Sequence, residues 1–237
     1  MKFLSRWEDS GYLKVDLLRK KSKNMEKEVK MKLIVVYDNE AGKKGLFADW
    51  GFSLFVDGEK KILFDTGRKP ELLENNLEVL GIDVENIDFV FISHPHHDHA
   101  GGLSYVLEKR PGIPVYVPAG WKKGENFIEV PDFQEISPGV YSTGTFGIEH
   151  AMVLETPKGA VVVVGCCHPG LSVFVEAAKR VGKVYMVIGG LHSFRDFSLL
   201  EKIDIIYPCH CTEYKERIAS LYPEKYHPCH GGLVISF

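Results

Sequence analysis

One segment organises the chain, and it reads Phe89-Val90-Phe91-Ile92-Ser93-His94-Pro95-His96-His97-Asp98-His99-Ala100-Gly101-Gly102-Leu103. It opens with an apolar, partly β-branched run, which is typical of a buried strand. It closes with Ala-Gly-Gly-Leu, which leads into residues 104–109 and indicates the start of a helix. Four of the chain's ten histidines lie within the six positions from His94 to His99. A loop at the end of a rigid strand can direct several such side chains at one point.

These side chains predict a metal site. Imidazole and carboxylate are ligands that Zn²⁺ takes, and iron and manganese accept them too. His94 and His96 can share one metal, whereas Asp98 and His99 can turn to a second. His97 lies between the two pairs and is expected to point away from both metals. The alternative is a solvated histidine-rich loop, which could still bind metal adventitiously.

The segment resembles the signature of the metallo-β-lactamase superfamily, and the resemblance extends over residues 31–237. Three more motifs carry it: an Asp-bearing turn, Leu63-Phe64-Asp65-Thr66-Gly67; a third histidine motif, Gly165-Cys166-Cys167-His168-Pro169-Gly170; and a last histidine motif, Pro208-Cys209-His210-Cys211-Thr212. Three further motifs are Tyr37-Asp38-Asn39, Leu73-Glu74-Asn75-Asn76 and Gly189-Gly190-Leu191-His192. Together with the third and last histidine motifs, they are similar to the dihydropterin-phosphate synthase-like group. This group includes archaeal enzymes of methanopterin biosynthesis.

The resemblance implies a four-layer αββα sandwich and a site for two divalent metal ions. By analogy with the superfamily, one metal is held by His94, His96 and His168, and the other by Asp98, His99 and His210. Zinc is the favoured metal, with manganese or iron as alternatives. His168 and His210 each follow a short β-run, as His94 does, which independently supports their convergence at one edge of the sheets. The alternative for both is a packed or surface histidine.

Asp65 ends a predicted strand, residues 62–64, and is the candidate for a supporting role behind the metals. A carboxylate there can accept an N–H from a metal-binding imidazole and so fix its tautomer. The alternative is an Asx-turn with Thr66 and Gly67. Both descriptions can hold at once.

His192 stands where many two-metal members of the superfamily carry an aspartate that bridges both metals. A neutral imidazole cannot bridge two cations as a carboxylate does, so His192 is expected to bind at most one metal. Asp98 and His192 are the candidate catalytic residues. The alternative is that His192 packs under its loop while Asp196 or Asp204 supplies the bridge.

The remaining pattern predicts two mixed sheets with helices on their outer faces, an α/β or α+β fold. Strands are expected over residues 32–37, 51–56, 61–64, 87–92, 115–117, 140–142, 149–156, 160–164, 183–188, 204–207 and 233–237. Helices are expected over residues 70–80, 104–109, 171–181 and 212–221, the first with Pro70 near its start and Gly81 past its end. Residues 121–134 are expected to form a loop-rich insertion.

The length and composition suit one sizeable domain. The chain has 237 residues and an apolar content of 45%, which is enough for a substantial core. Residues 1–30 hold nine Lys and Arg against five Asp and Glu, and they show little apolar periodicity. We expect them to form an N-terminal extension, either poorly ordered or helical. A metallo-β-lactamase-like domain is expected over residues 31–237.

Charge, hydropathy and cysteine usage narrow the function classes. The net charge of −3 gives no general attraction to nucleic acid or anionic membranes. No apolar run approaches the ~18 residues of a membrane span. Four of the five cysteines flank histidines, which is unlike a secreted disulfide framework and favours a reduced cytoplasm. The cysteines are expected to be small buried packing residues, with a metal-binding thiolate at Cys167 or Cys211 as the alternative.

The sequence favours a metal-dependent hydrolase that activates water against a small, phosphorylated or otherwise anionic molecule. The candidates for binding that anion are Arg68, Lys122, Lys123 and Arg195, each with a solvated surface charge as the alternative. Two other functions stay open: carbon–nitrogen bond formation of the dihydropterin-phosphate synthase type, and non-catalytic metal binding. Nothing in the sequence indicates recognition of nucleic-acid bases. A homo-oligomer is left open.

Overall fold

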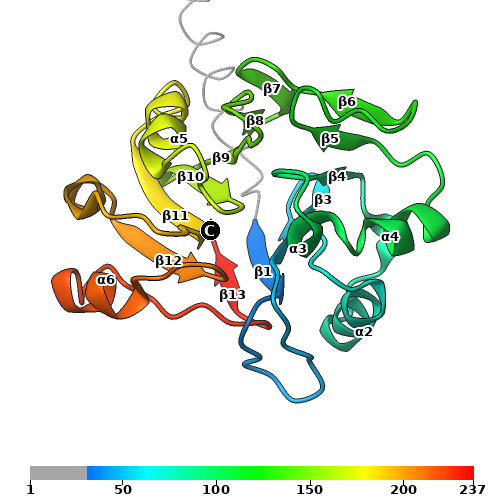
Figure 1. Cartoon of the computed structure of the whole chain (residues 1–237), viewed down its shortest axis with the longest axis horizontal. Helices are drawn as coiled ribbons and strands as arrows, with labels where there is room; N and C mark the ends of the chain where they lie inside the picture. Colours follow the sequence, from blue (N-terminus) through cyan, green and yellow to red (C-terminus); the bar gives the residue numbers. More distant parts are fainter. Residues whose placement is uncertain (1–30) are drawn as a thin grey trace, which may run out of the picture. The chain divides into compact units, whose positions relative to one another are not determined.

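The computed structural model describes residues 31–237 (Figure 1). The expected N-terminal extension, residues 1–30, lies outside the described residues. The strands are β1 Lys32–Tyr37, β2 Ser53–Asp57, β3 Lys61–Phe64, β4 Phe89–Phe91, β5 Val115–Val117, β6 Phe127–Glu129, β7 Gln134–Ser137, β8 Val140–Ser142, β9 Met152–Thr156, β10 Gly159–Val164, β11 Val184–Gly190, β12 Ile205–Cys209 and β13 Val234–Ser236. The α-helices are α2 Pro70–Leu80, α3 His97–Ala100, α4 Leu103–Lys109, α5 Leu171–Ala178 and α6 Lys215–Leu221, with 3-10 turns η1 Val84–Asn86 and η2 Phe197–Lys202.

The strands form two mixed sheets, as predicted. The first is seven-stranded, in the order β13-β1-β2-β3-β4-β5-β6, and the second is six-stranded, in the order β12-β11-β10-β9-β8-β7. Strands β3 to β6 run parallel to one another, and so do β10, β11 and β12. Within each sheet the carboxyl ends of these parallel strands therefore meet at one edge. The Asp- and His-bearing loops follow these ends.

Three buried clusters show that sheets and helices form four layers. The cluster between the two sheets includes Phe64, Phe91 and Ile188. Residues of the first sheet also pack with Leu73 of α2 and Val106 of α4. Residues of the second sheet pack with Phe174 of α5 and Ile218 of α6. The helices lie on the outer faces of the sheets (Figure 1), so the predicted αββα sandwich is confirmed.

The side chains of single strands divide between these clusters in the alternation that a strand dictates. In β4, Phe89 and Phe91 belong to the cluster between the sheets, whereas Val90 belongs to the cluster under α2 and α4. Successive side chains of a strand point to opposite faces, so a strand buried on both faces must be apolar throughout. This is why the run ahead of the histidine motif contains no polar residue.

Helix α2 spans the residues predicted for it. Pro70 occupies its first turn, and Gly81 ends it with a left-handed φ of 70°, a conformation that glycine adopts without strain. The buried Asn76 side chain donates to the carbonyls of Val36 and Phe47 at 3.0 Å each, which ties the loop after β1 to this helix. Among the described residues, no helix is both long and apolar enough to cross a bilayer.

Some elements differ from the prediction. Strand β6 lies inside the expected loop-rich insertion, where it extends the first sheet in parallel with β5. Only Phe127 of its three residues is buried, so the sequence offers no alternation to reveal it. Helix α6 begins at Lys215 instead of residue 212, because the Thr212 hydroxyl is hydrogen-bonded to the Cys209 carbonyl and to the Leu191 N–H.

Two cysteines are not simple packing residues, contrary to the expectation. Cys209, at the end of β12, forms a disulfide with Cys229. This bond joins the second sheet to the segment that leads into β13 of the first. Cys166, Cys167 and Cys211 are free thiols.

Candidate metal centre

Three histidines form a first group of donor atoms where β4 and β10 end. His94 follows β4, His96 directly precedes α3, and His168 follows β10. Nε2 of His94 lies 3.1 Å from Nδ1 of His96 and 3.3 Å from Nε2 of His168. The structure thus brings together the three side chains predicted for one metal. Their assignment as ligands stays a prediction.

A second group consists of Asp98, His99 and His210. Oδ2 of Asp98 lies 3.1 Å from Nε2 of His210 and 3.7 Å from Nε2 of His99. Asp98 and His99 lie in α3 on the side of the first sheet, whereas His210 directly follows β12 of the second. The ring centroids of His94 and His99 are 4.2 Å apart, so the two groups adjoin.

Supporting hydrogen bonds determine which ring nitrogens are free. An ionised Asp65 can only accept, and it accepts from Nδ1 of His99 at 2.7 Å and from Oγ of Ser93 at 2.8 Å. Because the Ser93 hydroxyl donates to Asp65, its oxygen accepts the N–H of His94 Nδ1 at 2.9 Å. When Asp65 is ionised, the Nε2 atoms of His94 and His99 are therefore unprotonated. Asp65 lies behind a ring of the second group, in the position that the sequence suggested.

Asn39 plays the same part for His210. Its amide oxygen accepts from Nδ1 of His210 at 3.0 Å, while its NH₂ group donates to the His210 carbonyl at 3.1 Å. Nε2 of His210 then carries a lone pair that faces the Asp98 carboxylate. Two such acceptors repel each other unless a proton or a metal cation lies between them.

The donor sets fit divalent metal ions. Two nitrogen ligands of one tetrahedral zinc lie about 3.3 Å apart, given Zn–N distances of about 2.0–2.1 Å. The separations of 3.1 and 3.3 Å around His94 are close to this value. In the second group, the 3.1 Å between Nε2 of His210 and Oδ2 of Asp98 is also close to this value. Imidazole and carboxylate suit zinc, iron and manganese.

Burial and neighbouring groups favour the metal-binding protonation states. Burial, and then the nearby His99 and His168, hold the pKa of His94 far below its ordinary value. Burial also lowers the pKa of His99 and of His168. Burial raises the pKa of Asp98, but the contacts with His210 and His99 outweigh this rise and hold that pKa below its usual range. Neutral imidazole and ionised carboxylate are the forms that bind metal.

The loops around these groups adopt strained backbone conformations. Among residues 31–237, four non-glycine residues have a left-handed φ: Asp65 at 52°, Cys167 at 60°, His192 at 45° and His210 at 44°. Each conformation of this kind costs about 1–3 kcal/mol and persists only where the surroundings impose it. All four lie in the Asp- and His-bearing loops, so the strain is concentrated at the site.

A buried carboxylate missing from the sequence predictions holds the third histidine loop. Glu149 accepts the backbone N–H groups of Cys166, Cys167 and His168 at 2.9, 2.9 and 2.7 Å. Burial raises the pKa of Glu149 to about 7, against the effect of these three hydrogen bonds. The one available signal was an acidic residue at the start of an otherwise apolar strand segment.

The loop between β1 and β2 supports the second group. Asp38 accepts the backbone N–H of His210 at 2.8 Å. The Trp50 indole donates to Oδ2 of Asp98 at 3.0 Å, and its ring lies 4.8 Å from that of His210. The Trp50 side chain is nevertheless 51% exposed, so it covers the group from the solvent side. Sequence spacing could not indicate Trp50, because its role depends on how the loop folds.

The structure does not bring His192 into either donor group. Its exposed ring lies 5.3 Å from that of His168, between centroids. His168, His192 and Ser193 line a cavity of about 250 Å³ beside the first group. His192 is therefore placed to contact a molecule in this cavity, and its predicted metal contact receives no support from the geometry.

The two aspartates considered as alternatives to His192 make other contacts. Asp196 accepts from the Ser198 hydroxyl at 2.7 Å. Asp204 forms an ion pair with Lys183 at 2.7 Å. Neither belongs to a donor group of the described residues.

The predicted anion-binding side chains do not converge. Arg68 and Lys122 are exposed, and Arg195 donates to the Tyr214 hydroxyl at 2.5 Å. They lie on separate loops, after β3, after β5 and after β11. These side chains therefore do not form a common anion-binding site, and each could bind an anion only separately.

His97 points away from the donor groups, as predicted. With Lys123 and Trp121 it lines a separate cavity of about 410 Å³ on the side of α4. Nζ of Lys123 lies 4.7 Å from the centre of the Trp121 ring. His150 is buried, and it is hydrogen-bonded to the Ser142 hydroxyl and the Ile92 carbonyl at 3.0 and 2.9 Å.

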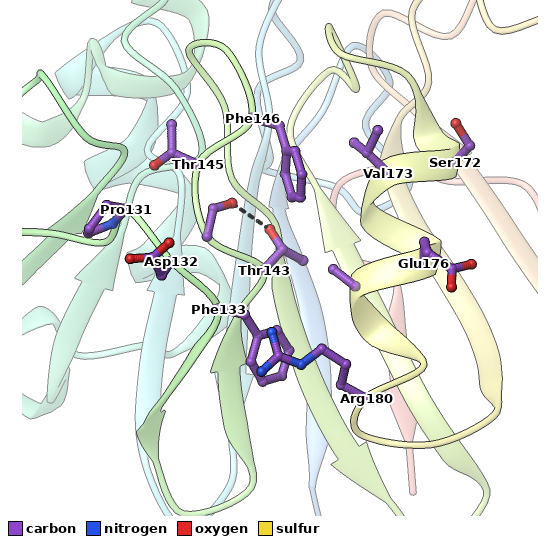
Figure 2. A pocket seen from close by; sticks show the side chains of 12 residues that line it. Pro131, Asp132, Phe133, Thr143, Thr145, Phe146, Ser172, Val173, Glu176 and Arg180 are labelled. Carbon is purple, nitrogen blue, oxygen red and sulfur yellow. Dashed lines mark hydrogen bonds between the residues drawn. The ribbon is translucent and has the colours of Figure 1, made fainter.

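Another cavity, of about 800 Å³, opens between α5 and the segments that precede β7 and follow β8 (Figure 2). Its wall includes Phe133, Thr143, Phe146 and Arg180. The Arg180 guanidinium lies 3.9 Å from the centre of the Phe133 ring. No side chain of the two donor groups lines this cavity, so it is not part of the candidate metal centre.

Known proteins share these features. The family profile of the metallo-β-lactamase superfamily matches residues 51–179. The 7,8-dihydropterin-6-methyl-4-(β-D-ribofuranosyl)-aminobenzene-5′-phosphate synthase of Methanocaldococcus jannaschii is 25% identical over 291 aligned residues, which cover 90% of this chain and 99% of the synthase. A solved metal-dependent hydrolase of the β-lactamase superfamily superposes with a TM-score of 0.72 at 24% identity, covering 86% of this chain and 98% of its own. The metallo-β-lactamase fold protein YhfI from Bacillus subtilis superposes with a TM-score of 0.63 at 14% identity, covering 88% and 100%.

The matched region and the site coincide. Residues 51–179 make up more than half of the chain. They contain five of the six donor side chains, all but His210. The two structural matches share the fold over 86% and 88% of this chain. This chain belongs to the metallo-β-lactamase superfamily.

Proposed function

We propose that this protein is a metal-dependent hydrolase with a two-metal site, zinc being the favoured metal, and that it acts on a small anionic molecule. The observation that carries the proposal is the pair of adjoining donor groups, His94–His96–His168 and Asp98–His99–His210. Divalent metals bound there would supply hydroxide at neutral pH and offset negative charge that develops on substrate oxygens.

The chain's own residues have separate tasks in this proposal. Asp65 and Asn39 hold the rings of His99 and His210 with their Nε2 lone pairs toward the site. Trp50 limits the access of water to the second group. His192, on the wall of the 250 Å³ cavity, is placed to donate a hydrogen bond or a proton to a substrate oxygen. A phosphate or carboxylate is the substrate group that such a positive site would favour.

A second candidate function is supported by one specific observation. The likeness to the Methanocaldococcus jannaschii synthase extends over 90% of this chain and 99% of that enzyme. In a synthase reaction of this kind, an arylamine attacks in place of water, and pyrophosphate leaves a dihydropterin. Both reactions build up negative charge on oxygen, so both would use the same donor groups. They differ in the molecule that the cavity accepts.

The first experiment measures metal content and turnover together. Wild-type protein loaded with zinc or manganese is expected to hold between one and two metal equivalents per chain. It should hydrolyse at least one member of a panel of phosphoesters, lactones and thioesters, and a chelator should abolish this turnover. The His94→Ala variant should lose most of the first metal equivalent. His97→Ala is the matched control, because His97 lies in the same loop but faces another cavity.

The outcomes separate the candidates. If wild type and His94→Ala were equally metal-poor after loading, the assignment of the metal site would be wrong, and the hydrolase proposal would fail with it. Release of pyrophosphate from a dihydropterin pyrophosphate and a ribosyl-aminobenzene phosphate, without hydrolysis of the panel, would establish the synthase instead. Full metal loading without either reaction would indicate a metal-binding protein that is not a catalyst.

A further inference from the structure

Two free cysteines lie against the second donor group. Sγ of Cys166 is 3.1 Å from Nε2 of His99, and Sγ of Cys211 is 3.2 Å from Sγ of Cys166. Cys166 also lies within 4.8 Å of donor atoms of His94 and of His210. Its sulfur therefore lies between the two groups, on the side of His99.

The backbone makes room for this pair of thiols. The left-handed conformation of His210, with φ at 44°, allows the consecutive side chains of His210 and Cys211 both to face the donor atoms. A Cβ atom at Gly190 would lie 2.7 Å from Sγ of Cys211, so a larger residue there would displace the sulfur. Glu149 fixes Cys166 through its backbone N–H.

The charge of the donor set also calls for an anionic ligand. The six side chains of the two groups comprise five neutral imidazoles and one carboxylate, Asp98. Two divalent cations in such a set would carry three positive charges that the six donor side chains do not offset, next to the buried rings of His94, His99 and His210. A thiolate is an anionic ligand that zinc binds strongly. Cys166 and Cys211 are the nearest groups that can supply one.

We propose that Cys166 and Cys211 complete the second metal site. Cys166 binds the metal as a thiolate, and Cys211 either binds the metal through its own sulfur or donates a hydrogen bond to the Cys166 sulfur. The inference rests on the proposed two-metal function. When the metal binds, the Cys166 thiol releases its proton to solvent and its sulfur takes up the bond to the metal. Ligands of one tetrahedral zinc lie about 3.3–3.8 Å apart when sulfur is included, so the contacts at 3.1 and 3.2 Å need to open by only a fraction of an ångström.

Cobalt loading tests the sulfur ligand directly, and Cys167 provides the matched control. Cys167 is also a free, buried cysteine, but it packs in the cluster under α5 and belongs to no donor group. Wild-type protein loaded with Co²⁺, without thiol reductant, should show a thiolate-to-cobalt charge-transfer absorption. Cys166→Ser should lose most of this absorption and bind the second metal at least tenfold more weakly. Cys167→Ser should keep both properties.

A second measurement needs no variant. X-ray absorption of the wild-type zinc protein should show a sulfur neighbour at about 2.3 Å from zinc. Two bound metals without sulfur scattering or charge-transfer absorption would overturn the inference and reduce the thiols to a buried hydrogen-bonded pair, while the hydrolase proposal would stand. Unchanged absorption in a Cys166→Ser/Cys211→Ser double variant would overturn it as well. A wild type that binds no metal would overturn the proposed function itself.

Discussion

Asp65 illustrates how one buried side chain can control a metal site that it does not touch. Its carboxylate accepts from Ser93 N at 2.7 Å, from Ser93 Oγ at 2.8 Å and from His99 Nδ1 at 2.7 Å. An asparagine keeps one acceptor oxygen, but its NH₂ group would face the donors Ser93 Oγ and His99 Nδ1. His99 would then have to move its proton to Nε2, on the metal side.

We therefore expect Asp65→Asn to weaken binding of the second metal by about 10–100-fold, the usual effect of removing such a partner. Metal titration followed by calorimetry measures this affinity. Asp88→Asn is the control, because Asp88 directly precedes β4 and pairs with Lys60 away from the site. Equal affinity in the Asp65 and Asp88 variants would leave Asp65 with a turn-forming role alone.

His150 should make the domain sensitive to acid. Burial lowers the pKa of His150 to about 3, whereas a histidine in an unfolded chain titrates near 6.5. Between these values the unfolded chain binds a proton that the folded protein does not. Stability is therefore fully present above the unfolded pKa and falls as the pH is lowered through this window, by up to about 1.4 kcal/mol per pH unit.

His150→Gln removes this proton and should give a shallower fall in the free energy of unfolding between pH of about 6.5 and 4. Urea unfolding of the metal-free protein at several pH values measures the slope. His97→Gln, at an exposed position, serves as the control and should keep the wild-type slope. Identical slopes for all three proteins would show that His150 does not contribute to acid sensitivity.

At the scale of residues, the sequence indicated the convergence of the donor side chains better than it indicated the residues that support them. His94, His96, Asp98 and His99 are close in the chain, so their common direction follows from one strand and one loop. Glu149, Trp50 and Cys166 reach the site through contacts between elements that are distant in sequence, and residue type alone does not reveal such contacts. The pairing of Cys209 with Cys229 was missed for the same reason.

The junction between α3 and α4 is the element on which the second group depends most. The Thr66 N–H and hydroxyl both donate to the His99 carbonyl, at 2.7 and 3.0 Å. A Cβ atom at Gly102 would collide with the Thr66 carbonyl and lie 2.9 Å from a methyl of Leu73. Glycine at this position allows the helix start to pack directly against the Asp65 turn.

Gly102→Ala should therefore destabilise the domain by about 1–3 kcal/mol, the usual cost of overpacking, and weaken the second metal through displacement of His99. Gly182→Ala is a matched control, because a Cβ atom there meets nothing within 4 Å and the backbone is not left-handed. That variant should change stability by no more than about 1 kcal/mol. Urea midpoints measure both effects. A Gly102 variant as stable as the Gly182 variant would contradict the close packing.

Local signals explain which elements could be predicted. Helix α2 was predicted over its full length because Pro70 and Gly81 mark its two ends and its apolar spacing is regular. Strand β6 was missed because it has one buried side chain and exists only through its pairing with β5. The order of strands within each sheet also depends on long-range pairing, and the sequence pattern does not determine it.

For the domain as a whole, the candidate metal centre connects the two sheets. His94, His96, Asp98 and His99 lie at the end of the first sheet, whereas His168 and His210 follow strands of the second. Each donor group therefore takes side chains from both sheets. Metal bound to either group would be bound by the folded arrangement and not by the unfolded chain, so binding must stabilise the domain.

Metal loading should accordingly raise the melting temperature, and this rise should require the donor side chains. At free metal about 100 times Kd, one site stabilises by about 2.7 kcal/mol, which corresponds to a rise of roughly 5–10 °C for a domain of this size. His96→Ala should lose most of this rise. His97→Ala, one residue along the same loop, should keep it, because its ring faces the cavity beside Trp121. Calorimetric scans with metal and with chelator measure the difference, and equal rises in the two variants would show that metal binds elsewhere.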